Sequence, residues 1–441
     1  MVEQYDKTSV ESIYNFAKLI TGKSLVEVTT LPFAIENLRN RGDLGKMVED
    51  FFFKHQPPNT GDPDFAEAGL ELKTTGLVQD SKGGYRAKER LVLTQINFTK
   101  LANEMWDNST LLHKCQLMLI MFYLYDKHVP VFDQKFVLPP LLLDFPGEDL
   151  IQIRRDWEII KAKVQAGKAH ELSEGDTFYL SACRKGSGGP NEKLVKQPFS
   201  SEGAKSRAFS LKSSYVTKLI KGHSDSEATL GVSSKMTFEE ATEAKFQPFY
   251  GKSIDEISSK LNYFKVSKNQ KGFNRSLANR ILADGDGDVT ELAKAGIQMK
   301  TIRLSNTGKL KESMSFKGFS YMDIVHEDWD ESTFADELEK KFLFIVFQFD
   351  NDGNERLKKV VYWNMPYEDR KEARLVWERT REQVKVDARY LPKSSESPVA
   401  HVRPKATNSK DTIPTPQGMM LVKKGFWLNR GYVEKVINSL L

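Results

Sequence analysis

The chain has 441 residues, of which 39% are hydrophobic and 28% are charged, and it carries a formal net charge of +5. It contains no run of 18 apolar residues, so no membrane span is expected, and its two cysteines are too few for a disulfide scaffold or a structural zinc site. The length favours two domains of about 200 residues each, and the charge is compatible with a nucleic-acid ligand without requiring one.

The first half of the chain alternates helical and strand-like patterns. Helical spacing runs over residues 9–19 and again over 44–55, where apolar side chains form a stripe. Residues 68–77 alternate apolar and charged side chains, which predicts a half-buried strand. Further expected elements are strands over 90–98 and 117–125, a helix over 156–167 that ends at a glycine, and a strand leading into a helix over 207–220.

Four segments of the first half return in the second half in the same order. The paired segments begin 229, 227, 220 and 217 residues apart, and such slowly drifting offsets indicate duplication of one α/β domain. The pairs are 21–25 with 250–254, 68–74 with 295–301, 156–164 with 376–384, and 207–220 with 424–437. The polar stretch before the second copy predicts domains over 1–222 and 245–441, joined by a solvent-exposed linker over 223–244.

The stretch "GDPDFAEAGLELKTTG" (61–76) places Asp64, Glu71 and Lys73 within ten residues. Carboxylate oxygens are the ligands that Mg²⁺ prefers, and a bound ion with an adjacent lysine suits hydrolysis of a phosphodiester. Asp62 is a rival acid, but its place before a proline is typical of a turn. The spacing alone also fits an ordinary salt bridge at a solvated strand edge.

With its flanks, this stretch resembles the MutH family of PD-(D/E)xK nucleases, and especially the GATC-cutting type II restriction endonucleases built from two MutH-like halves. The similarity extends over "GKMVEDFF" (45–52), "KERLVLTQIN" (88–97) and "GFWLNRGYVEKVINSLL" (425–441). The resemblance implies two tandem restriction-endonuclease-like α/β domains, each with a mixed central sheet flanked by helices. It also implies a magnesium-dependent nuclease whose second copy has lost catalysis.

The resemblance assigns roles to five residues of the first half. Asp64, Glu71 and Lys73 match the family's metal-binding acids and its lysine. Glu49 matches a further acid of the metal site, although on its helix it could equally be a solvated charge. Lys114 matches a lysine near the scissile phosphate.

The family reads GATC from an R-P-K loop and from an aromatic residue in a G-F-aromatic-L-K strand. In the first half a cysteine, Cys183, stands at the first arginine and Ser210 at the aromatic position. Arg184, Lys185 and Lys212 are therefore the candidate DNA contacts, since arginine and lysine are the side chains that most often read guanine. The alternative is that they contact phosphates only and add no specificity.

The second half keeps the residues that would read DNA. Arg403, Pro404 and Lys405 preserve the R-P-K pattern, and Trp427 supplies the aromatic side chain. This half is therefore expected to bind DNA, unless it serves only as a structural buttress.

The second half has lost the residues that would cut. Gln298 stands at the position of Glu71 and Ser276 at that of Glu49, while Lys300 is retained. Glu291 falls at the position of Asp64, but one acid beside a glutamine is a poor magnesium site.

These features predict a type II restriction endonuclease that cuts double-stranded GATC before the guanine and leaves a four-base 5′ overhang. The second half is expected to act as an allosteric effector that binds a second GATC site. The protein is expected to be a monomer in solution, a homodimer on DNA and a resident of the bacterial cytoplasm. The alternatives are a mismatch-repair nicking enzyme of the same family and a non-catalytic DNA-binding regulator.

Overall fold

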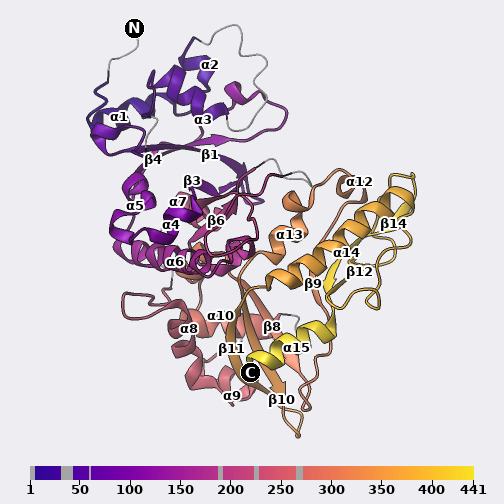
Figure 1. Cartoon of the computed structure of the whole chain (residues 1–441). Helices are drawn as coiled ribbons and strands as arrows, with labels where there is room; N and C mark the ends of the chain where they lie inside the picture. The colour runs from indigo at the N-terminus through magenta and orange to yellow at the C-terminus, as the bar shows by residue number, and fades with distance from the viewer. Residues whose placement is uncertain (1–4, 31–42, 59–60, 187–191, 223–227, 265–271) are drawn as a thin grey trace.

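The computed structural model describes residues 5–30, 43–58, 61–186, 192–222, 228–264 and 272–441. The two halves of the chain pack against each other, with the N-terminus on the first half and the C-terminus on the second (Figure 1). In the part of the chain thus covered, no helix is long and apolar enough to cross a membrane.

The first half has the predicted α/β composition. Its strands are β1 (Glu71–Gln79), β2 (Tyr85–Ala87), β3 (Leu91–Gln95), β4 (Leu117–Leu124), β5 (Leu141–Asp144), β6 (Leu180–Arg184) and β7 (Arg207–Leu211). Its helices are α1 (Val10–Ala17), α2 (Leu25–Val28), α3 (Asp43–Met47), α4 (Phe98–Asn103), α5 (Thr110–Cys115), α6 (Gly147–Gln165) and α7 (Ser213–Lys221). The expected helix over 44–55 is instead α3 followed by a π-helical turn, Val48–Phe52.

Two sheets, rather than one, form this half. The mixed sheet has the order β2-β1-β4-β5, with β1 and β4 parallel, and the second sheet is antiparallel in the order β3-β7-β6. The expectation that β1 is half-buried is wrong, because Leu72 and Glu71 are both buried on its opposite faces. Leu72 packs in the cluster formed with the N-terminal helices, and Leu77, which shares a face with Glu71, lies in the cluster on the other side of the sheet.

The second half repeats this architecture. Its strands are β8 (Gln298–Leu304), β9 (Met314–Gly318), β10 (Phe342–Phe349), β11 (Glu355–Trp363), β12 (Ala400–Pro404), β13 (Thr412–Pro414), β14 (Met420–Val422) and β15 (Lys424–Leu428). Its helices are α8 (Phe238–Phe246), α9 (Ile254–Lys260), α10 (Phe273–Ala283), α11 (Thr290–Ala295), α12 (Tyr321–Ile324), α13 (Thr333–Leu338), α14 (Tyr367–Val386) and α15 (Arg430–Leu440).

The strand pairing confirms the duplication. β8 and β10 are parallel, as β1 and β4 are, and the second sheet has the order β12-β15-β9, which repeats β6-β7-β3. Lys73 lies opposite Ile120 of β4, and Lys300 lies opposite Phe344 of β10. The two lysines therefore occupy equivalent positions on equivalent strands.

One hydrophobic core connects the two halves. It runs from β4 and α6 through α8, α10 and α11 to β10 and β11. Leu230, Val232 and Phe238 are buried in it, so residues 228–244 are not the solvent-exposed linker that their polar composition suggested. The segment has few large apolar side chains, and most of these are buried, although Met236 is exposed. Residues 223–227 lie outside the described part, and the domain boundaries stay a prediction.

Candidate active site and its counterpart

The turn before β1 holds Asp64 and Glu71 together. Both carboxylates are buried, with Asp64 8% exposed and Glu71 fully covered. The backbone N–H of Asp64 donates to Glu71 Oε2 at 3.1 Å, and the N–H of Leu72 donates to Asp64 Oδ2 at 2.9 Å. These two bonds fix each acid against the backbone of the other segment, so their spacing in the sequence becomes a fixed spacing in the fold.

Two lysines converge on Glu71. Lys73 forms an ion pair with Glu71 Oε1, and Lys114 from α5 lies 3.4 Å from the same oxygen. Burial alone would lower the pKa of Lys73, but the groups around it, led by Glu71, together hold that pKa above its ordinary value. Lys73 is therefore kept as an ammonium beside the acids.

Glu49 lies in the π-helical turn and faces the same cluster. Its pKa is raised to about 7, mainly by burial and then by the charge of Asp64. A helix charge surrounded by water would show neither effect. The structure therefore places Glu49 within electrostatic reach of the acids, as the metal-site hypothesis requires.

His55 joins the segments that carry these acids, and the sequence patterns did not single it out. Its ring Nε2 lies 2.6 Å from the carbonyl oxygen of Asp64, its backbone N–H donates to the carbonyl of Glu49 at 2.9 Å, and its ring stacks on Phe65 at 4.4 Å. Because a carbonyl only accepts, Nε2 must carry the proton. In the sequence, the one sign that His55 could connect the two acidic segments is that it lies between Glu49 and Asp64.

Asp62, the rival acid, is turned away from Glu71. Its Oδ1 lies 2.8 Å from His113 Nε2 at the surface of α5. This contact connects the turn to the helix that carries Lys114, which agrees with a turn role for Asp62.

The chemistry of this cluster fits a divalent cation with oxygen ligands. Asp64, Glu71 and Glu49 are neighbouring carboxylates, and burial raises the pKa of both glutamates, so a cation would relieve their charge. No three His, Cys, Asp or Glu side chains within the described ranges are already arranged around one ion position. Glu71 is instead held by Lys73 and Lys114.

One candidate reading residue of the first half, Arg184, is engaged by the second half. Arg184 pairs with Asp330, its Nη2 also donates to the Asp330 carbonyl at 3.1 Å, and it lies 3.6 Å from Glu339. Lys205 pairs with the other Asp330 oxygen at 2.6 Å. Cys183 is buried, and residues 187–191, which follow these candidates, lie outside the described part.

Lys185 is exposed, whereas Lys212 is not available to DNA. Lys212 is 2% exposed, and its ammonium donates to the carbonyl of Thr177 at 2.7 Å. Burial lowers its pKa to about 8. The expectation that Lys212 contacts DNA is therefore wrong. Lys212 lies between β7 and α7, and its ammonium is buried against the carbonyl of Thr177.

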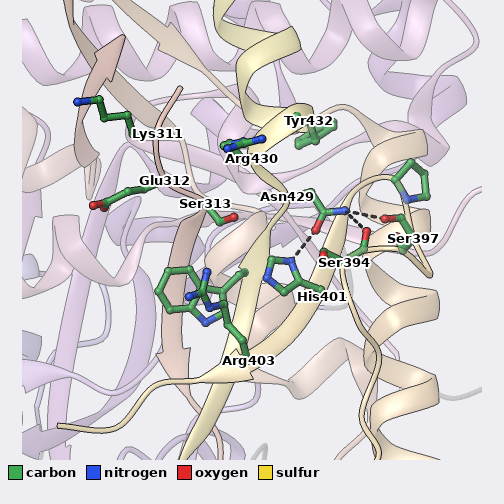
Figure 2. A pocket seen from close by; sticks show the side chains of 13 residues that line it. Lys311, Glu312, Ser313, Ser394, Ser397, His401, Arg403, Asn429, Arg430 and Tyr432 are labelled. Atoms are coloured by element: carbon green, nitrogen blue, oxygen red, sulfur yellow. Dashed lines mark hydrogen bonds between the residues drawn. The ribbon is translucent and has the colours of Figure 1, made fainter. Parts of the chain in front are cut away.

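The second half brings its three reading candidates together. Arg403 and Lys405 lie over the ring of Trp427, at 4.7 and 5.0 Å from its centre, and Lys405 donates to Ser315 of β9 at 2.6 Å. Arg403 and Trp427 line a cavity of about 860 Å³, which His401 and Arg430 also border (Figure 2).

The residues of the second half at the positions of Asp64, Glu71 and Glu49 have other surroundings and other chemistry. Gln298 is neutral, and the carboxylate of Glu291 accepts bonds from the backbone N–H groups of Leu230 at 2.9 Å and Gly231 at 3.1 Å. Glu291 therefore holds the segment before α8 instead of facing Lys300. Ser276 lies on α10 and offers no carboxylate.

Comparisons with known proteins agree with this architecture. The family model described as "DNA mismatch repair enzyme MutH" matches residues 53–156 and 284–375, one segment in each half. The type II restriction enzyme Sau3AI of Staphylococcus aureus is 31% identical over 98% of this chain and 99% of its own length. DNA mismatch repair proteins MutH from Shewanella sp. (strain MR-7) and Shewanella baltica (strain OS185) are each 25% identical over 46% of this chain and 91% of their own lengths.

Proposed function

The chain belongs to the MutH family and is a type II restriction endonuclease, and from this premise we propose that it cuts double-stranded DNA at GATC. The observation that carries the proposal is the buried Asp64–Glu71–Lys73 cluster with Lys114 beside it. The cut falls before the guanine and leaves a four-base 5′ overhang. The enzyme acts in the bacterial cytoplasm.

Magnesium is the cofactor in this proposal, held by Asp64, Glu71 and Glu49. When bound there, it would lower the pKa of a water molecule and offset charge on the phosphate. Lys73, kept as an ammonium, orients that water and stabilises negative charge as it develops. Lys114 contacts the scissile phosphate from α5.

Plasmid DNA with several GATC sites tests the reaction. Incubation with Mg²⁺ should give linear fragments whose ends begin with GATC, and EDTA should abolish cleavage. Nicked circles as the final product would favour the mismatch-repair alternative, which is also disfavoured because the MutH relatives match only 46% of this chain. Retarded but uncut DNA would favour the non-catalytic alternative.

The second half acts as an effector in this proposal. It binds a second GATC duplex through Arg403, Lys405 and Trp427 and promotes pairing of two chains. Pairing is needed because GATC is a palindrome with two scissile phosphates, while each chain holds one set of acids. The protein is a monomer without DNA, and its rate should rise more than linearly with enzyme concentration.

The double variant Arg403→Ala/Lys405→Ala tests the effector role. It should cut single-site DNA slowly, and an added GATC oligonucleotide should no longer stimulate it, since each bidentate guanine contact contributes roughly 1–3 kcal/mol of discrimination. Lys358→Ala, an exposed lysine on β11 that bonds Gln348, is the control. Undiminished stimulation of the double variant would show that this half does not read GATC.

A further inference from the structure

Cations gather around two adjoining cavities of the second half. The larger, of about 860 Å³, is lined by Arg403 and Arg430, and the smaller, of about 210 Å³, by Lys300. Lys311, Glu312 and Ser313 line both, so the two cavities adjoin, and together they are called the concavity below. Figure 2 shows Lys311, Arg403 and Arg430 around the larger cavity.

These cations differ from their neighbours in having no carboxylate partner. Within the residues that the structure describes, none of Lys300, Lys311, Arg403 and Arg430 forms an ion pair. Other arginines of this half do: Arg303 pairs bidentately with Glu355 at 2.8 Å, and the pairs Arg356–Asp350 and Arg389–Asp387 are similar.

The charge of the concavity is predominantly positive. Glu312 is the one acid among its described lining residues, against the four unpaired cations. A concave surface lined by one sign of charge focuses its potential and attracts a counter-ion. The exposed side chains of Lys311, Arg403 and Arg430 leave this potential open to a large ligand.

The part of the concavity that Lys300 lines corresponds to the place of the acids in the first half. Lys300 is the structural counterpart of Lys73, but Gln298 is neutral and Glu291 faces other backbone groups. Burial, and then the nearby charges of Arg275, Lys405 and Lys340, hold the pKa of Lys300 below its ordinary value, although Glu337 opposes them. Positive charge has thus replaced the carboxylates, and here an anion could be held directly.

We propose that this concavity binds the phosphate backbone of duplex DNA without a metal ion, with Lys300, Lys311 and Arg430 as the phosphate contacts. Arg403, above Trp427, is left to read a base edge. The inference rests on the proposed effector role of the second half. It adds that some cations bind phosphates while Arg403 contacts a base. Lys300 would supply part of the positive charge that a metal ion would supply at the proposed site of the first half.

Salt dependence of DNA binding by the full chain tests this division. The Glu71→Ala background prevents cutting, EDTA removes metals, and anisotropy measures affinity for GATC and scrambled duplexes over a KCl series. Because Arg184 is held by Asp330, the first duplex is expected at the second half. Lys300→Met, Lys311→Met and Arg430→Met should each reduce the slope of log K against log salt by about 0.9 and weaken both duplexes by the same factor.

Conservative and control variants test whether each residue contacts a phosphate or a base. Arg430→Lys should keep the parental slope, because a phosphate needs only the charge, whereas Arg403→Lys should lose preference for GATC. Lys371→Met removes a lysine that lines neither cavity and pairs with Glu368, and its slope should stay at the parental value. If Lys300→Met does not fold, the exposed Lys311 and Arg430 still decide the matter.

Two results would overturn the inference. One is an unchanged slope in all three methionine variants, and the other is a loss confined to the GATC duplex, which would make these residues base readers. Failure of the effector role itself has a different signature. In that case Arg403→Ala/Lys405→Ala would keep full preference for GATC, whatever the slopes of the other variants.

Discussion

The two halves place the same strands in the same register but present opposite chemistry on them. In the first half Lys73 lies beside the carboxylates of Glu71 and Asp64. Cys183, which stands at the position of Arg403, is buried. In the second half Lys300 has Arg275, Lys405 and Lys340 near it as well as Glu337, and Arg403 and Trp427 open onto a cavity. In the proposed function, the duplicated fold divides cutting and reading between its copies, because a few side chains on equivalent strands set the charge of each site.

The largest effect should come from making the first half resemble the second. Glu71→Gln copies Gln298 and removes a carboxylate from the proposed metal site, so cleavage should fall about a thousandfold or more while DNA binding persists. Plasmid cleavage and anisotropy measure the two properties. The reverse change, Gln298→Glu, should create no second cutting centre, because Glu291 is engaged by Leu230 and Gly231.

A smaller loss should follow when His55 cannot donate to Asp64. His55→Leu keeps an apolar side chain over Phe65 but removes the hydrogen bond, and partners of metal ligands are typically worth about tenfold or more in metal affinity or activity. His55→Gln offers an amide donor in place of Nε2 and should restore most of the activity. Hydrogen exchange at the Leu72 amide, which donates to Asp64, should quicken in the leucine variant only; equal behaviour of both variants would exclude a positioning role.

Release of Arg184 should change activity several-fold. Asp330→Asn removes the charge that holds Arg184 and Lys205, and a partly exposed ion pair contributes up to about 1 kcal/mol, or roughly fivefold. Cleavage of single-site DNA without an added oligonucleotide should therefore rise. The exposed neighbour Glu331→Gln is the matched control, and a fall in the Asp330→Asn rate would contradict the view that the second half covers this reading face.

The smallest effect concerns Glu49, whose counterpart is the uncharged Ser276. The pKa of Glu49 in the folded protein, about 7, lies above its ordinary value of 4.5. Folding therefore favours the protonated form, and the contribution of Glu49 to metal-free stability should be fully present below pH 4.5 and be lost as pH rises through about 7. Thermal unfolding in EDTA at pH 5 and pH 8 should show a smaller decline for Glu49→Gln than for the parent protein, and equal declines would contradict the assigned environment.

The sequence by itself determined the duplication, several of the helices and strands of the first half, and the proximity of Asp64, Glu71 and Lys73. These features follow from local spacing, because alternation along a strand and a short turn before it bring nearby residues together wherever the strand lies. The resemblance of the flanking segments supplied Glu49 and Lys114, which come from other elements.

Only the tertiary structure decided which of the candidate residues are open to solvent and which are engaged by other parts of the protein. It joined His55 to Asp64, turned Glu291 toward Leu230, buried Lys212 against Thr177 and closed Arg184 with Asp330. Each of these contacts joins different elements, the last across 146 residues of chain. Whether a lysine meets solvent, a carbonyl or an aspartate depends on which surfaces pack together, and that information is absent from the spacing of neighbouring residues.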